Sequence, residues 1–297
     1  MLNFNHLNNE EAFKRHLANL QITEEQYETL DTRIHVAKRE EFAGINLVPI
    51  VQEPDGIGFQ VLKDYTLTEM ADGIIAMDFV PDEDTIDKTP NTQDVPIMQQ
   101  SYLLTARDLA SSNGNLRSPV LDSALYKLAE TQDKYLIDGW YMDGGTTPYQ
   151  NGLYNAAGNN TAGADFGTAT QVVTTLNTAF STLATTGNFF STGFNLTLNP
   201  VQYNELMALF TNTGIPVVNW VMTRLQGGKI YQSNAITAGT GMLTAAGDHS
   251  FFEYHISVDR GHWEYVRPET QDVWGKIYIV STLRVIDDNA IMTLTGI

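Results

Sequence analysis

The spacing of hydrophobic and polar positions changes along the chain, and the changes separate helical from strand-like stretches. The capping box Thr23-Glu24-Glu25-Gln26 predicts a helix ending near Glu41, because its side chains can satisfy the first free backbone amides. Apolar residues at helical spacing, beginning with Tyr27 and Leu30, give this helix one apolar face. Residues 1–21 are polar and rich in Asn, with sparse apolar points, and predict an arm.

Strand-like segments follow this helix and are broken by Gly, Pro and Asp. Strands are expected at residues 45–51, 58–68, 74–79 and 95–104. The last two are separated by residues 81–94, which are too polar to form a core. We therefore expect long hairpins here, with residues 81–94 as an exposed loop or hairpin tip.

The second half of the chain mixes helices and short strands. Ser118-Pro119 predicts the start of a long helix through Trp140, because a capping residue precedes a first-turn proline. The small residues from Ala156 to Gly167 predict a mobile surface loop. Beyond them we expect a helix at 168–185, a short buried strand at 194–198, a helix at 200–210, and strands at 251–257, 262–266, 276–283 and 284–295.

Composition narrows the classes of function. The 297 residues can bury one large core or two modest ones, and the absence of cysteine excludes disulfides and thiolate chemistry. A formal charge of -18 disfavours a protein that reads nucleic acid. Because there is no run of eighteen apolar residues and no basic start followed by an apolar stretch, we expect neither a membrane span nor a signal peptide. The absence of cysteine predicts a cytoplasmic protein.

Common signatures of catalysis and cofactor binding are absent from the sequence, including the phosphate-binding loop, the dinucleotide fingerprint, the nucleophile elbow and the zinc-binding helix. Gly227-Gly228-Lys229 lacks the hydroxyl residue that would follow the lysine in a phosphate-binding loop, so it predicts a turn. No enzyme activity and no cofactor are therefore predicted.

Two places in the sequence contain residues that could bind a metal ion. His255 and His262 have Asp248, Glu253 and Asp259 nearby in the sequence, but their scatter over strand segments favours surface or packing histidines. The acidic stretch 82–87 lacks the ligand spacing and glycine of a calcium-binding loop and predicts a solvated loop. No metal site is predicted.

The order of elements is the strongest indication of a fold. An arm, a capped helix, an extended two-stranded excursion, a long helix, an α/β region and a return to long strands follow one another. This order resembles the tailed-phage major capsid protein family, whose fold is shared with encapsulins. The resemblance covers about residues 20–297, and the local stretches that carry it are 20–33, 95–98, 116–140, 152–154, 194–199, 225–230 and 284–294.

The resemblance implies an α+β fold with the regions of a capsid subunit, which are lobes of one cooperative unit. These regions are an amino-terminal arm, helix and first strand at 1–51; an extended β-hairpin loop at 52–94; a peripheral domain with a long spine helix at 95–167; an axial domain at 168–270; and closing strands returning to the peripheral domain at 271–297.

As a function, the resemblance implies a major capsid protein that self-assembles into hexamers and pentamers of an icosahedral shell enclosing a double-stranded DNA genome. The shell would be a virion capsid assembled in the host cytoplasm, in non-specific proximity to packaged DNA and without a membrane. Scaffolding, portal and decoration proteins are further implied partners, with any scaffolding expected as a separate chain.

An extended hairpin and an arm bury little surface within their own subunit and leave unpaired edges. They are therefore expected to dock on neighbouring subunits. The predicted contact residues are Phe59, Val61, Tyr65 and Met77 on the extended loop, and Phe4 and Leu7 on the arm.

Three alternatives stay open. The first is an encapsulin-type nanocompartment around an enzyme cargo, although the arm before Thr23 is longer than encapsulins usually carry. The second is a hydrolase using buried carboxylates, which requires a pocket that perturbs their pKa values. The third concerns a capsid crosslink through Lys63 or Lys88, for which the sequence identifies no partner asparagine or catalytic carboxylate.

Overall fold

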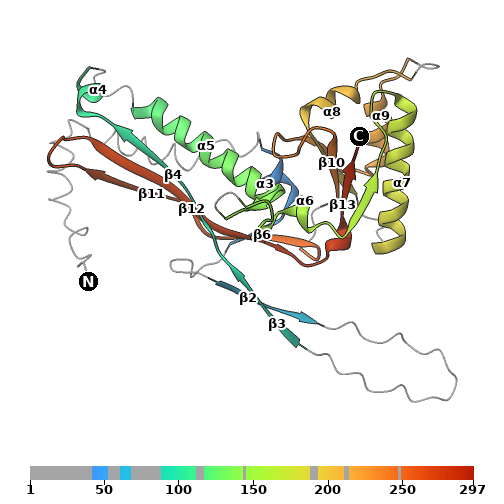
Figure 1. Cartoon of the computed structure of the whole chain (residues 1–297), viewed down its shortest axis with the longest axis horizontal. Coiled ribbons are helices and arrows are strands. Elements are labelled where there is room, and N and C mark those ends of the chain that lie inside the picture. The colour runs from blue at the N-terminus through green and yellow to red at the C-terminus, as the bar shows by residue number, and fades with distance from the viewer. Residues whose placement is uncertain are drawn as a thin grey trace.

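The computed structural model describes residues 42–52, 61–67, 88–111, 117–142, 145–187, 193–210, 214–246 and 249–297. The predicted arm, the helix from Thr23 to Glu41 and the strand at 74–79 lie outside these residues. The described chain forms an elongated lobe and a compact lobe, with a two-stranded hairpin projecting away from both (Figure 1).

The elongated lobe is a four-stranded sheet with a long helix on one face (Figure 1). In spatial order its strands are β1 (Ile50–Gln52), β11 (Phe252–Val266), β12 (Val273–Val285) and β4 (Ile97–Leu104). The helix α5 (Arg117–Ile137) packs on β4 and β12, while α3 (Ala43–Leu47) and α4 (Ala106–Ser111) flank it. Side chains on a strand alternate between faces, so Val273, Ile277 and Ile279 are buried while Trp274 and Tyr278 lie on the other face.

The compact lobe is a five-stranded mixed sheet. Its strands lie in the order β7 (Asn159–Ala162), β13 (Ile291–Thr295), β10 (Thr240–Ala245), β8 (Phe194–Leu198) and β9 (Ile230–Gln232). The helix α7 (Ala169–Gly187) packs against β7 and β13, and α8 (Pro200–Glu205) and α9 (Val217–Arg224) complete the lobe. Short elements join the lobes: β5 (Gly139–Trp140), β6 (Gln150–Asn151), α6 (Leu153–Ala156) and the 3-10 helix η1 (Asp288–Ala290).

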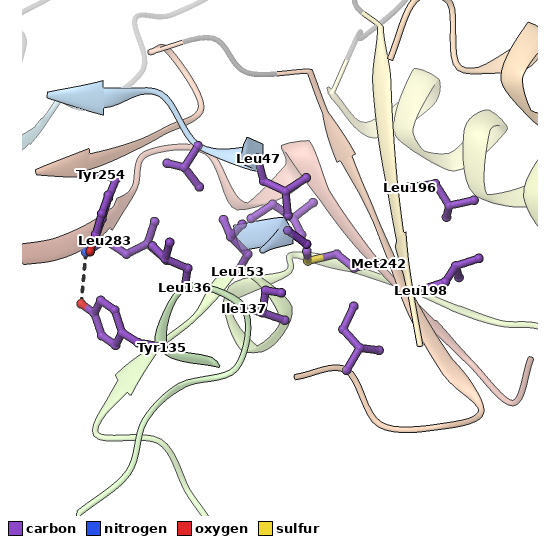
Figure 2. Packing of buried hydrophobic residues seen from close by; sticks show 14 of the residues in the cluster. Leu47, Tyr135, Leu136, Ile137, Leu153, Leu196, Leu198, Met242, Tyr254 and Leu283 are labelled. Carbon is purple, nitrogen blue, oxygen red and sulfur yellow. Dashed lines mark hydrogen bonds between the residues drawn. The ribbon is translucent and has the colours of Figure 1, made fainter. Parts of the chain in front are cut away.

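One hydrophobic core runs through both lobes. Leu136 and Ile137 at the end of α5, Leu153 of α6 and Met242 of β10 are all fully buried in it (Figure 2). Beside them the Tyr135 hydroxyl accepts a hydrogen bond of 3.1 Å from the Leu283 amide. Burial raises the pKa of Tyr135 to about 12, so this hydroxyl stays neutral. The two lobes are therefore parts of one folded unit.

Several sequence predictions are confirmed. The long helix appears as α5, the helix at 168–185 as α7, and the short strand at 194–198 as β8, which is buried along its whole length. The strands predicted at 58–68 and 95–104 appear as β2 (Val61–Leu67) and β4. The two strands predicted at 251–257 and 262–266 are one long strand, β11, whose pairing with β12 shifts register twice between Ile256 and Gly261.

Other predictions were wrong, and for two of them pairing with distant strands decides the structure. Residues 45–51 are not one strand: α3 comes first, and β1 is shorter. Residues 88–94 of the predicted loop form a strand, β3 (Lys88–Asp94), because they pair with β2. Part of the predicted loop at 156–167 forms β7, which pairs in parallel with β13. The helix at 200–210 ends early, and α9, β9 and β10 were not predicted.

The boundaries of the five predicted regions stay a proposal, because strands are shared across them. β11 falls within the 168–270 range yet pairs with β12 in the elongated lobe. β13 falls within the 271–297 range yet lies inside the sheet of the compact lobe. The chain therefore crosses between the lobes more often than the linear division indicates.

Gly227 and Gly228 give a matched test of the turn after α9. A β-carbon added at Gly228 would overlap the Phe194 carbonyl oxygen, whereas one at Gly227 would meet no atom within 4 Å. We expect Gly228→Ala to lower the free energy of unfolding by about 3 kcal/mol because the backbones must separate. Gly227→Ala should cost about 1 kcal/mol, the strain of its φ of +95°. Urea unfolding measures both, and equal losses would contradict the turn geometry.

Candidate functional site

The β2–β3 hairpin is the candidate assembly element. Its strands pair antiparallel from Val61 opposite Asp94 to Leu67 opposite Lys88, and they form a sheet of their own. Within the described part of the chain no third strand pairs with either edge. Figure 1 shows the hairpin standing away from both lobes. An isolated two-stranded ribbon is only marginally stable in water, so this geometry calls for a partner surface.

Contacts at the base of the hairpin hold it to the elongated lobe. Gln93 Nε2 donates a hydrogen bond of 2.6 Å to the Leu283 carbonyl of β12. The Tyr149 hydroxyl donates to the Asp94 carboxylate, and this negative neighbour raises the pKa of Tyr149. Thr282 Oγ1 lies 3.4 Å from the Asp94 carbonyl that it faces. The base of the hairpin is therefore held by the Leu283 carbonyl and the Thr282 hydroxyl of β12 and by Tyr149, which directly precedes β6.

Asp133 of α5 is a buried carboxylate that joins three segments. Its Oδ1 accepts a hydrogen bond of 2.6 Å from the Gly44 amide in the first turn of α3. Its Oδ2 accepts one of 2.6 Å from the Ser233 hydroxyl, just after β9 of the compact lobe. The cap position of α3, Phe42, offers no side-chain hydrogen bond, so Asp133 satisfies that helix end from a distance. It thereby links the spine helix α5, the segment of α3 and the compact lobe.

Burial raises the pKa of Asp133 above its usual value of 3.8, against the opposing effect of the hydrogen bonds from Ser233 and Gly44. Between the usual and the raised pKa the folded chain binds more protons than the unfolded chain. The contribution of Asp133 to stability is therefore greatest at low pH and falls as the pH rises through this window.

The direction of this pH dependence of stability can be tested with Asp133→Asn, which cannot titrate. As the pH rises from about 3.8, the wild type should lose stability relative to this variant until the raised pKa has been passed. Asp272→Asn is the matched control, because hydrogen bonds from Thr270 and Ala106 lower the pKa of Asp272 and reverse the sign. Urea unfolding across this pH range checks both, and parallel profiles for wild type and Asp133→Asn would contradict the assignment.

The two histidines with acidic neighbours in the sequence, His255 and His262, lie in two separate clusters. His262 Nε2 is 3.4 Å from Glu264 Oε1 and 2.7 Å from the Tyr102 hydroxyl. His255 Nε2 is 3.1 Å from Glu253 Oε2, which also pairs with Arg284 at 3.0 Å. Each His and its Glu are two residues apart on a strand and so share a face. Among the described residues no group of three or more His, Asp or Glu is placed to hold a metal ion.

A hollow of about 360 Å³ lies between α7 and α9 and is lined by Asn177, Phe180, Ser181, Ala184, Phe194, Arg224 and Gln226. Arg224 donates a hydrogen bond of 2.8 Å to Asn177 at its edge. This lining contains no carboxylate, and both oxygens of the buried Asp133 are already hydrogen-bonded elsewhere. The hydrolase alternative, which needs an acid and a base in one pocket, therefore gains no support from these residues.

The predicted contact residues are only partly placed. Phe4, Leu7, Phe59 and Met77 lie outside the described residues. Val61 and Tyr65 lie in β2, of which only the backbone is described. Docking of all six residues stays a prediction. So does a crosslink through Lys63 or Lys88, which pair opposite Thr92 and Leu67.

Sequence reasoning missed the residues that fix the hairpin base and the Asp133 junction. One signal for Asp133 was present: a carboxylate beside the apolar stripe of the long helix, three residues before Leu136. A charge at a buried helical position is costly unless it is hydrogen-bonded, and here that cost is met by the Gly44 amide and the Ser233 hydroxyl. For Asp94 and Tyr149 no comparable signal exists.

The two lobes, the long spine helix and the projecting hairpin define the fold of shell-forming capsid proteins. A family model described as "Encapsulating protein for peroxidase" matches residues 10–260. The chain belongs to this encapsulin family, whose fold is shared with phage capsid proteins. The predicted family and α+β fold class are thereby confirmed.

Solved structures of shells share this fold at low sequence identity. A virus-like particle from Pyrococcus furiosus is 14% identical with a TM-score of 0.67, covering 90% of this chain and 98% of that one. The capsid of Myoviridae phage XM1 is 14% identical with a TM-score of 0.65, over 85% and 90% of the two chains. A chain from Mycobacterium phage Che8 is 13% identical with a TM-score of 0.60, over 85% and 90%.

No curated protein sequence matches this chain. In the described part of the chain no helix is long and apolar enough to span a membrane. The family is one of structural shell proteins, so the site to be explained is a surface for assembly.

Proposed function

We propose that this chain is the major capsid protein of a tailed virus, a structural subunit without enzymatic activity. Its copies form hexamers and pentamers of an icosahedral shell around a double-stranded DNA genome. The β2–β3 hairpin carries this proposal, because it stands away from its own subunit with both edges unpaired in the described structure. Neighbouring copies supply the surface that such an element lacks.

The charge of the chain is compatible with a shell that packages nucleic acid without binding it tightly. With a formal charge of -18 the wall does not hold DNA through many phosphate contacts, so packaged DNA stays mobile inside the shell. A virion location, assembly in the host cytoplasm, and scaffolding, portal or decoration proteins belong to the same proposal. So does the division into arm, extended loop, peripheral domain, axial domain and closing strands.

A second candidate is an encapsulin nanocompartment that encloses an enzyme. The description of the matching family, which names encapsulation of a peroxidase, favours it. The fold serves both candidates, since a virus-like particle and phage capsids resemble this chain to similar degrees. The contents of the shell, not its wall, distinguish them.

The test uses shells purified from the native source, treated with nuclease and then opened. Double-stranded DNA of uniform length, in shells that contain hexamers as well as pentamers by electron microscopy, supports the viral capsid. A co-purified enzyme without protected DNA supports the nanocompartment. Negative-stain microscopy of the chain expressed alone tests the common premise, and a stable monomer at high concentration would overturn both.

A further inference from the structure

The face of the four-stranded sheet that points away from α5 carries exposed aromatic side chains. Tyr265, Trp274 and Leu103 lie opposite one another on β11, β12 and β4 and form one row across the sheet. Trp263, Lys276 and Ser101 form the next row. Leu103, Trp263 and Tyr265 are 48%, 43% and 46% exposed. These six residues are called the outer patch below.

The rings of the outer patch support one another. Trp263 lies parallel to Tyr265 with ring centroids 6.2 Å apart, and meets Trp274 edge-on at 5.4 Å. The next row continues the surface: the Tyr278 ring covers Gly261, where an added β-carbon would overlap it. Rings already held in place lose little conformational freedom on docking, so this is a preformed contact surface. A contiguous exposed apolar surface of this kind marks an interaction site.

The outer patch differs in charge from the rest of the chain. The sequence holds 35 acidic and 17 basic residues, yet the two rows of the patch contain Lys276 and no carboxylate. Copies that each carry a formal charge of -18 repel one another. Contact between them is least unfavourable on a face without carboxylates. The composition of the outer patch therefore fits a partner that is itself acidic.

The patch residues of β11 lie beyond the part of this strand that pairs with β1. β1 pairs only with Tyr254 to Ile256 of β11, whereas the outer-patch residues of β11 lie farther along the strand. In the described residues, β12 borders this part of β11 on one side and no strand borders it on the other.

We infer that the outer patch is a contact between copies of this chain, buried when the shell assembles, with Trp263 and Tyr265 as its anchors. The inference rests on the proposed shell function and names one of its interfaces. Every copy presents the same patch, so only a partner present in equal number covers all of them. A second copy is such a partner, and its acidity matches the carboxylate-free surface.

The absence of cysteine allows one thiol to report on the patch. Ser101→Cys places it in the outer patch, and Thr178→Cys places a control on the exposed side of α7. For each variant, the rate of alkylation by iodoacetamide, a small neutral reagent, is measured in shells that resemble those of the wild type and in dissociated subunits. We expect Ser101→Cys to react about tenfold more slowly in shells, as a closed contact requires, and Thr178→Cys to change far less. Equal rates for Ser101→Cys in both states would overturn the inference.

A second measurement separates burial between copies from enclosure inside the shell. Tyr265→Glu adds a carboxylate to the patch, and Thr178→Glu adds one on α7. We expect Tyr265→Glu to raise the protein concentration needed for assembly about tenfold or more, a loss of about 1.4 kcal/mol. Circular dichroism and urea unfolding check that the subunits of both variants remain folded.

The outcomes separate this inference from the proposed function. If wild-type chains form no shells, the proposed function fails. If wild-type shells form and Tyr265→Glu assembles like Thr178→Glu, the proposed function stands and only the inference about the outer patch fails. This holds even if Ser101→Cys is protected in shells. Protection that disappears after nuclease treatment or removal of an enclosed protein also overturns the contact between copies.

Discussion

Replacing residues 68–87 by an Asn-Gly turn should give a folded subunit that no longer forms shells. Leu67 and Lys88 lie directly opposite each other in the hairpin, so a two-residue turn can join β2 to β3 without changing their register. The core residues that the structure describes in both lobes lie in other segments, and we expect their packing to be unchanged. Size-exclusion chromatography with light scattering measures assembly, and circular dichroism with urea unfolding measures folding.

A variant with residues 68–87 replaced by a Gly-Ser linker of equal length is the matched control. It keeps the length of the hairpin but removes the side chains of residues 68–87. Loss of shells in both variants would show that these side chains are required. Shells formed by the linker variant alone would show that length suffices. Normal shells from the shortened chain would contradict the role of the hairpin in assembly.

Asp133→Ala should lower the free energy of unfolding by about 4 kcal/mol. The change leaves the buried Gly44 amide and Ser233 hydroxyl without their partner, and each such loss costs about 1–3 kcal/mol. It also removes the only described side-chain cap on the first turn of α3, which Phe42 cannot replace. Asp133→Asn keeps one acceptor oxygen and should lose about half as much.

Thr131→Ala, at an exposed position of the same helix, is the control and should change stability by less than about 0.5 kcal/mol. Urea unfolding at neutral pH compares the three variants. Ser233→Ala combined with Asp133→Ala should cost less than the sum of the single changes, because both remove the same hydrogen bond. Additive losses would show that Asp133 and Ser233 do not stabilise the fold through a shared hydrogen bond.

The elements that sequence reasoning predicted correctly are those whose signal is local. The proline at the start of α5 and its apolar stripe identify a long helix, and the buried run of β8 identifies a strand. β7, with the sequence NNTA, and β3, with KTPNTQD, carry no such signal. They become strands only because β13 and β2 offer them hydrogen-bonding partners, and pairing between distant segments is not encoded in a short window.

The functional surfaces divide in the same way. Of the projecting hairpin, β2 could be predicted from the strand-like segment at 58–68, whereas the polar residues 88–94 were predicted as a loop and form β3. The contacts that hold the base of the hairpin could not be predicted, because Gln93 and Tyr149 reach partners far away in the sequence. The alternation around Trp263 predicted a strand, but which face of that strand meets α5 depends on the pairing of β11 with β12 and of β12 with β4.

The position of β13 has a consequence for the timing of synthesis. It is the last strand along the chain that the structure describes, yet it lies between β7 and β10 in the compact lobe. Chains emerge from the ribosome amino terminus first, so β7 waits for its partner until residues 291–295 have been made. A chain interrupted by stalling or proteolysis before that point keeps an open sheet. In such a chain the edges of β7 and β10 that β13 would cover stay available for pairing with other chains.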